Sequence, residues 1–298
     1  MTALAKSRIS ASKRRVNTLP LLSPSIFVLL LWMIVPLAMT LWFSFQRYNL
    51  LNPSMTGFAG IDNYKSLLTD STLWTAMQNT LILVVSVLAV TVVLGTMLAV
   101  LFDQEFFGRG VARLLIIAPF FVMPTVSALI WKNMMLHPVN GLVAFLMSLV
   151  GLEGIDWFGN WPMTSVVIIV SWQWLPFAIL IFLTAIQSLD QEQKEAARMD
   201  GARSIKMFFF IILPHLKRAI SVVIMIETIF FLSIFAEIFV TTSGGPGLAT
   251  TNLAYLIYIR SLLEYDVGSA SAGGVIAIVL ANVVATFLIR TIARQLEA

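Results

Sequence analysis

Six long apolar stretches dominate the sequence and constrain its fold more than any other feature. A helix needs about 20 residues to cross the roughly 30 Å of hydrocarbon in a bilayer. Each stretch is long enough, and none alternates in polarity as the strands of a membrane barrel would. A helix also satisfies its own backbone hydrogen bonds in lipid. The stretches therefore predict transmembrane helices at residues 26–45, 76–102, 111–135, 162–189, 219–241 and 268–291.

The composition agrees with a chain that faces lipid. Of the 298 residues, 59% are hydrophobic and 11% are charged, whereas soluble domains carry about 25% charged residues. The absence of cysteine excludes disulfides and thiolate metal sites, and we predict no metal site of another kind. The sequence thus predicts an all-α integral membrane protein with six transmembrane helices. Kinks are expected at the prolines inside the predicted spans, which are Pro36, Pro119, Pro124 and Pro176.

The distribution of Lys and Arg predicts the orientation of these helices, because cytoplasmic loops are enriched in both residues. With both termini inside the cell, 15 of the 19 Lys and Arg residues fall in cytoplasmic segments, which leaves Arg47, Lys65, Lys132 and Arg260 on the other side. Residues 1–25 then form a cytoplasmic segment, and residues 26–291 form a six-helix transmembrane domain. The first span is too long for the h-region of a cleavable signal peptide.

The longest internal cytoplasmic loop, about residues 190–217, gathers charges around a glycine. Asp190 is a good N-cap for a short helix over residues 191–200, and Gly201 suits a left-handed C-cap that ends it. Ser204 favours the start of a second helix, which Pro214 is expected to end. Such an angled helix pair either lies on the lipid surface or docks into a partner.

Ten positions in this loop form a motif with fixed spacing. They are Glu195, Ala196, Ala197, Asp200, Gly201, Ala202, Phe208, Ile211, Leu213 and Pro214. The motif resembles the EAA loop of ATP-binding-cassette importer permeases, although Arg203 departs from the small residue common after the Gly–Ala pair. In that family the loop forms coupling helices that insert into a cleft of the ATPase subunit. The resemblance implies the same role for this loop.

Other stretches narrow the resemblance to maltose-type carbohydrate permeases. Residues 57–80 and 113–135, and an outer segment with Thr242, Gly244 and Thr250, are similar to that family. The region 235–258 looks closest to permeases for polyols such as mannitol and sorbitol. The resemblance implies a subunit of an ATP-driven, binding-protein-dependent importer for a sugar or polyol in the bacterial cytoplasmic membrane. Taken alone, the GGPG sequence at 244–247 predicts a turn just outside the fifth span.

The sequence also indicates which components this chain would need from elsewhere. It contains no Walker-type phosphate-binding sequence. ATP and Mg would therefore bind to separate ATPase subunits, and we predict that this chain binds no cofactor and is not an enzyme. Six helices make only half a pathway. The implied partners are a second permease subunit, two ATPase subunits and an extracytoplasmic substrate-binding protein, with membrane lipid around the helices and no nucleic acid.

Two other functional classes remain as alternatives. A stand-alone ion-coupled carrier would need ionisable residues inside the membrane, and Glu227 and Glu237 could serve. The chain has no convincing internal repeat of the kind that many such carriers show. An intramembrane enzyme is disfavoured, because no paired Asp or Ser–His arrangement is present and His137 and His215 are isolated.

The predicted substrate pathway uses polar and aromatic side chains of spans four to six. A carboxylate that faces lipid is costly, so Glu227 and Glu237 should point into the protein or a wet cavity. Carboxylates accept hydrogen bonds from polyol hydroxyls, and aromatic rings support the C–H faces of a polyol. Alternatively, the tryptophans only pack against Pro176 and neighbouring helices. The candidates are Trp172, Gln173, Trp174, Glu227, Glu237 and Asn282.

Overall fold

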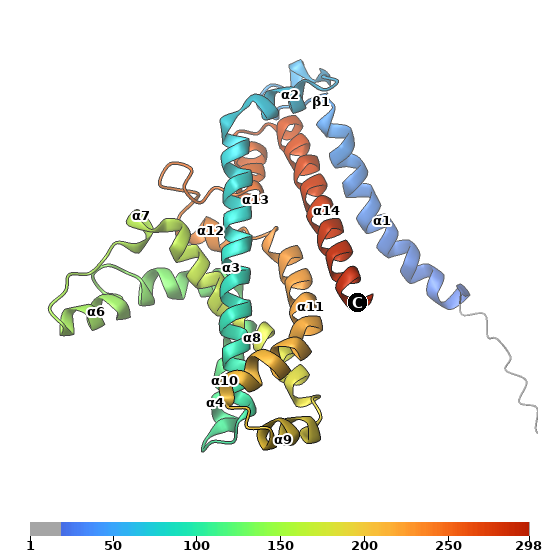
Figure 1. The fold of residues 1–298 in the computed structure, drawn as a ribbon. Coiled ribbons are helices and arrows are strands. Elements are labelled where there is room, and N and C mark those ends of the chain that lie inside the picture. Colours follow the sequence, from blue (N-terminus) through green and yellow to red (C-terminus); the bar gives the residue numbers. More distant parts are fainter. Residues whose placement is uncertain (1–18, 298) are drawn as a thin grey trace, which may run out of the picture.

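The structure is a computed structural model that describes residues 19–297, so residues 1–18 of the predicted N-terminal segment lie outside the described residues. It consists of helices around a long central helix, with one two-stranded antiparallel sheet (Figure 1). In chain order the elements are α1 (Leu19–Ser44), β1 (Gln46–Arg47), η1 (Pro53–Met55), β2 (Gly57–Phe58), α2 (Asp62–Thr69), α3 (Ser71–Asp103), α4 (Arg109–Ile117), η2 (Ala118–Phe121), α5 (Pro124–Ile130), η3 (Trp131–Met135), α6 (Leu142–Leu149), α7 (Trp157–Asn160), α8 (Pro162–Gln187), α9 (Gln191–Met199), α10 (Ser204–Met207), η4 (Phe208–Ile212), α11 (Leu213–Phe231), α12 (Ala236–Thr241), α13 (Leu253–Tyr258), η5 (Ile259–Leu263) and α14 (Val267–Glu297).

Helices α3 and α8 form the centre of the bundle. Gly95 of α3 faces α8 so closely that a Cβ at this position would lie 3.0 Å from the Cβ of Ala178 and 3.3 Å from the ring of Phe182. Small residues allow this kind of close approach between helices in membranes. Leu216 and Val223 of α11 are buried in the same apolar cluster. The three helices therefore share one packed core.

The remaining elements take up distinct positions around this core (Figure 1). Helices α1 and α14 lie side by side, while α6 and α7 project on the opposite side of α3. Helices α4, α9 and α10 gather at one end of α3, and the strands and α2 lie at the other end. The predicted cytoplasmic connections around residues 104–110 and 190–204 are thus at the same end of the molecule.

The described residues contain five helices that are long and apolar enough to cross a membrane, or six if one bent pair forms a single span. The all-α fold class is confirmed. Helices α3 and α14 contain two of the predicted spans, and α1 and α8 cover two more except for their last one or two residues. The third predicted span is the bent pair, Arg109–Phe121 and Pro124–Met135, which turns by 108° just before Pro124, one of the prolines where we expected kinks. Met123 is extended, as the residue before a proline tends to be. In contrast, α1 continues through Pro36 and α8 through Pro176.

The predicted bounds of the fifth span, 219–241, are wrong. One helix runs from Ile205 to Phe231, and the chain then leaves helical structure before α12 begins. The prediction that Pro214 ends the second loop helix is also wrong. The π-helical turn η4 ends two residues before this proline, and Leu213 N donates to Phe208 O. This wider turn accommodates a residue that lacks an N–H group and crowds the preceding turn.

The GGPG sequence forms a turn after α12, as predicted, and segment 242–252 packs against α3. Asn79 Nδ2 donates to Leu248 O at 2.7 Å and to Thr251 O at 2.9 Å. The buried Asn252 donates to Ile234 O at 2.6 Å and accepts from Tyr255 N. Non-helical backbone inside a membrane protein needs such partners. Side chains from α3 and from the segment itself supply them.

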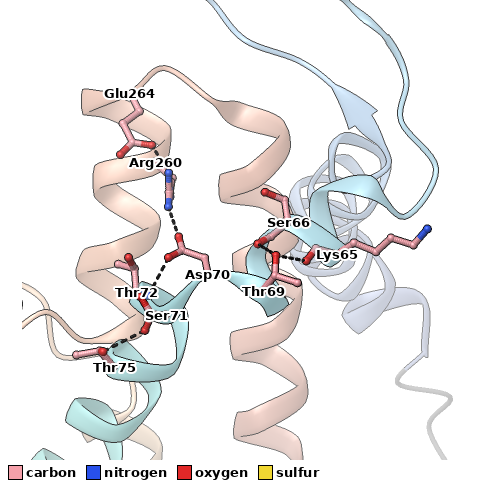
Figure 2. A network of polar contacts seen from close by, with 9 residues as sticks. All are labelled: Lys65, Ser66, Thr69, Asp70, Ser71, Thr72, Thr75, Arg260 and Glu264. Atoms are coloured by element: carbon pink, nitrogen blue, oxygen red, sulfur yellow. Dashed lines mark hydrogen bonds and ion pairs between the residues drawn. The ribbon is translucent and has the colours of Figure 1, made fainter.

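A polar network joins the beginning of α3 to η5 (Figure 2). Asp70 caps α3 by accepting from Thr72 N at 2.8 Å. Arg260 pairs with Asp70 Oδ2 at 2.5 Å and with Glu264 Oε2 at 2.7 Å. Burial acts to raise the pKa of Asp70, but the hydrogen bonds from Thr72 and the charge of Arg260 outweigh it, so the pKa lies below its ordinary value. The network connects segments 190 residues apart.

Candidate functional site

The loop with the motif begins with a capped helix, as predicted. Asp190 Oδ1 accepts a hydrogen bond from Glu192 N at 3.0 Å, and α9 begins at the next residue, Gln191. An aspartate in this position satisfies a backbone N–H that has no partner within the helix. Its negative charge also matches the positive end of the helix dipole. The start of α9 is therefore determined locally.

Gly201 ends α9 in the conformation predicted from the sequence. Its φ angle is +78°, in the left-handed region. Gly201 N donates to Arg198 O at 3.0 Å, and Ala202 N donates to Ala197 O at 2.9 Å. These two bonds form a Schellman motif, the common ending of a helix at glycine. No atom lies within 4 Å of a Cβ built on Gly201, so backbone conformation, and not lack of space, requires glycine here.

Helix α9 has one face toward the protein and one toward solvent. Lys194 and Ala197, three residues apart, are buried. Glu195 and Ala196 are exposed, and Met199 on the same side is 89% exposed. We call Glu195, Ala196 and Met199 the outer face of α9. An exposed methionine and alanine beside a carboxylate form a surface that suits a protein partner.

The other motif residues differ in exposure between the tip of the loop and its root. Asp200 and Gly201 are exposed, whereas Ala202 is half-buried. Phe208 is half-buried and packs against the core cluster of α3, α8 and α11. Pro214 is exposed at the start of α11. The loop is thus polar at its tip and anchored by an aromatic ring at its root.

The candidate pathway residue Glu227 is buried inside the bundle. It is fully buried on α11, and Thr91 Oγ1 of α3 donates to its Oε2 at 2.6 Å. Its other oxygen has no hydrogen-bond partner within the part of the chain that the structure describes. The side chain therefore points into the protein, as expected, and joins α3 to α11.

Gln173 lies at the break in the bent pair. Its Nε2 donates to Val122 O at 2.8 Å, and its Oε1 is buried without a partner among the described residues. Val122 is the residue between η2 and Met123, where the chain turns. Gln173 therefore caps a carbonyl that the broken helix leaves free.

The two candidate tryptophans lie in aromatic packing. Trp172 meets Trp131 with ring centroids 5.7 Å apart. Trp174 is surrounded by aromatic rings with centroid distances of 4.8 to 6.0 Å, and these rings belong to Phe120, Phe177, Phe230 and Phe231. All five contacts have the tilted or edge-on geometry that aromatic pairs prefer. Packing between helices, the alternative we noted from the sequence, describes both residues.

Glu237 is buried on the short helix α12. Lys132 Nζ, on the second arm of the bent pair, donates to Val240 O of the same helix at 2.9 Å. A cation at the C-terminal end of a helix is favourable both as a cap and through the dipole. Lys132 therefore holds the helix that carries Glu237.

The structure does not bring Asn282 together with the other candidates. Asn282 is exposed on α14 and donates to Ile278 O within its own helix. The hollow beside it is lined by residues of α14 alone. Among the described residues, no group of three or more His, Cys, Asp or Glu side chains could hold a metal ion.

Sequence reasoning missed several polar residues that cap irregular backbone or buried carboxyl groups. Asn79, Thr91, Lys132 and Asn252 all donate across helices or breaks. Each is an isolated polar residue in or beside an apolar stretch, and a polar residue there is costly without a partner. This signal identifies the residues but not their partners.

A comparison with known families decides what kind of protein this geometry belongs to. Residues 91–298, more than half of the chain, match the family described as binding-protein-dependent transport system inner membrane component. The chain belongs to this family. It is therefore a multi-pass membrane component of a transport system.

Two curated relatives support the assignment of this chain to a family of transport permeases. The probable ABC transporter permease protein y4oQ of Sinorhizobium fredii is 34% identical over 251 residues, which cover 84% of this chain and 81% of the relative. The trehalose/maltose transport system permease protein MalF of Thermococcus litoralis is 32% identical over 251 residues, covering 83% and 84%. Both relatives are transport components.

A solved structure shows the same fold. The bacterial ABC transporter involved in the import of the acidic polysaccharide alginate aligns with a TM-score of 0.79 at 23% identity. The alignment covers 92% of this permease and 94% of the solved chain. The break in the bent pair and the loop around α9 therefore lie within a chain that has a permease fold along most of its length.

Proposed function

We propose that this permease is one transmembrane subunit of an ATP-driven, binding-protein-dependent importer, and that residues 190–217 couple it to an ATPase subunit. The observation that supports this is the geometry of α9. Its ends are fixed by Asp190 and Gly201, and its outer face of Glu195, Ala196 and Met199 is open to a partner. A helix held rigidly on one side and exposed on the other suits the transmission of a force.

The orientation we propose places both termini and α9 in the cytoplasm of a bacterial cell with this chain in its cytoplasmic membrane. The excess of Lys and Arg in the corresponding segments supports it. The connection 104–110 and α9 lie at the same end of the molecule, as this orientation requires (Figure 1). The family description as an inner membrane component agrees with this location.

The complete importer would contain a second permease subunit, two ATPase subunits and an extracytoplasmic binding protein. ATP and Mg would bind to the ATPase subunits, because the sequence of this permease contains no phosphate-binding loop of the Walker type. The solved alginate transporter includes a complex with a substrate-bound periplasmic protein. This supports a binding protein as a partner here too.

The cargo we propose is a carbohydrate, either a sugar or a polyol such as mannitol or sorbitol. One relative is named as a trehalose/maltose permease, and one solved relative imports alginate. For the pathway we retain the six predicted side chains. Glu227 and Gln173 each have one buried oxygen without a partner in the described chain, and such acceptors suit a hydroxyl-rich cargo. The tryptophans would line the pathway as packed walls, and Asn282 would act only from the exposed side of α14.

The test co-expresses this permease with its sister subunit, the ATPase subunits and the binding protein, and measures two properties. ATPase subunits should co-purify with the wild-type chain and with Glu153→Lys, an equal charge reversal in the exposed connection before α7, but weakly with Glu195→Lys, because only Glu195 belongs to the outer face. Proteoliposomes are then screened for ATP-dependent uptake of radiolabelled hexitols, pentitols and disaccharides. Uptake by the single purified permease without any ATPase would instead support the ion-coupled carrier.

A further inference from the structure

The buried face of α9 carries a charge that the motif does not explain. Lys194 precedes the motif, and its side chain is 9% exposed. Its Nζ lies 3.2 Å from Oδ2 of Asp103, the last residue of α3, whose side chain is 27% exposed. Burying a lysine is costly unless the ammonium group is paired. Because Lys194 is buried, the ion pair does not serve to hydrate the surface, and its presence between α9 and α3 needs another explanation.

The end of α3 is held by cations from two elements, α4 and α9. Arg113 of α4 donates to Phe102 O at 2.6 Å, and Arg109 donates to Gln104 O at 3.3 Å. Positive groups here satisfy free carbonyls and match the negative end of the helix dipole. Lys194 is the one that comes from the candidate coupling helix.

A cavity of about 620 Å³ separates α9 from the end of α3. Its polar lining comes from both sides: Asp103, Gln104, Glu105, Gln191, Lys194 and Arg198. The inner face of α9 is thus not sealed by apolar packing across this gap. Within residues 19–297 no other ion pair joins α9 to another helix. The Lys194–Asp103 pair bridges the cavity directly.

Helix α3 in turn contacts the parts of the bundle that would have to move. Gly95 brings it against α8, and Thr91 donates to Glu227 on α11. Near its other end, Asn79 holds the backbone of segment 242–252. A displacement of the end of α3 therefore reaches three separate elements through direct contacts.

We propose that Lys194 and Asp103 are positioning residues that transmit movement of the coupling helix to α3. This inference rests on the proposed coupling role of the loop. The outer face of α9 binds the ATPase subunit, and the ion pair on the inner face passes the displacement to the bundle. Spatial continuity alone does not establish coupling, so the energetic connection between the two residues has to be measured.

The two single substitutions differ in a way that helps the experiment. Lys194→Met removes the buried charge and leaves Asp103, which is more exposed and borders the polar cavity, where water can hydrate it. Asp103→Asn leaves an unpaired ammonium group in the more buried position. We therefore expect Lys194→Met to fold normally and Asp103→Asn to be the less stable variant. The double variant Lys194→Met/Asp103→Asn leaves no unpaired charge.

The experiment uses the whole importer in proteoliposomes with its binding protein, and measures cargo taken up per ATP hydrolysed. Lys194→Met should lower this ratio about fivefold or more, the lower range of typical coupling energies, while the ATPase subunits still co-purify. Lys194→Arg should retain most of the ratio. Arg198→Met, which removes an exposed charge from the same helix and cavity, is the matched control and should behave as wild type.

The double variant decides whether the two residues act together. If the pair is the link, the double variant has the same defect as Lys194→Met alone, because the second substitution removes nothing further. Independent effects that multiply in the double variant, or a wild-type ratio in Lys194→Met, overturn the inference. The proposed function fails separately, when ATPase subunits do not co-purify with the wild-type permease.

Discussion

Replacing Gly201 by valine tests whether the turn after α9 carries the coupling. The φ angle of +78° is costly for a residue with a Cβ, by about 1–2 kcal/mol. No atom lies within 4 Å of the added Cβ, so the Cβ itself adds no steric clash to this cost. A cost of this size lowers the ratio of the native turn to other conformations about 5- to 30-fold. The affinity for the ATPase subunits can therefore fall by at most the same factor, because only the native turn presents α9 correctly.

Gly108 provides a matched control for this substitution. Its φ angle is +79°, it also has no atom within 4 Å of an added Cβ, and it lies at the same end of the molecule in the connection before α4. Gly108→Val therefore carries the same backbone strain outside the proposed coupling loop. Gly201→Asn is the conservative variant, since asparagine tolerates the left-handed region better than other residues do.

The assay compares the three variants in proteoliposomes that contain the whole importer. Gly201→Val should separate ATP hydrolysis from uptake and weaken retention of the ATPase subunits. Gly108→Val should leave both properties near wild type, and Gly201→Asn should retain most of the uptake. Full uptake with normal ATPase stimulation in Gly201→Val would refute the reasoning. Equal losses in Gly201→Val and Gly108→Val would show that strain at this end of the protein, and not the coupling loop, is responsible.

Three further predictions concern the pathway, the segment behind it and the outer network. Glu237→Gln should reduce uptake while ATPase subunits remain bound. If Glu237→Gln and Glu227→Gln both keep the wild-type uptake affinity and rate, the cargo site lies elsewhere. Asn79→Leu should lower the melting temperature, because each of the two carbonyls left without its donor costs about 1–3 kcal/mol, whereas the exposed Asn282→Leu should not. The lowered pKa of Asp70 stabilises the fold above the ordinary aspartate pKa, and this contribution is lost as pH falls through the lowered value. The difference in melting temperature between wild type and Asp70→Asn should accordingly shrink in acid, and a difference that stays constant with pH would contradict this account.

Local features were predicted well where their cause lies within one helical turn. Asp190 caps α9 and Gly201 ends it, because a capping oxygen and a left-handed glycine act on neighbouring backbone groups. The break before Pro124 has the same origin, since a proline restricts the residue before it. Pro214 was misjudged, because a π-helical turn absorbed it.

The candidate pathway was predicted less well, because its arrangement depends on neighbouring helices. The burial of Glu227 follows from the cost of a carboxylate in lipid, but nothing in the sequence pairs it with Thr91, 136 residues away. Asn282 was grouped with the other candidates by its position in a span, yet it faces outward. Polarity in a span indicates that a partner is needed, and the helix packing decides which partner is available.

The sequence by itself determined that the chain is a set of apolar helices, where four of them lie along the chain, and the helix–turn–helix shape of the loop. These properties follow from hydrophobic length and from backbone groups a few residues apart. Only the tertiary structure decided that the helix of α11 stops at Phe231, that segment 242–252 lies against Asn79, and that Lys194 meets Asp103. Each of these contacts joins residues that are close only after α3, α8 and α11 have packed, so no local pattern could encode them.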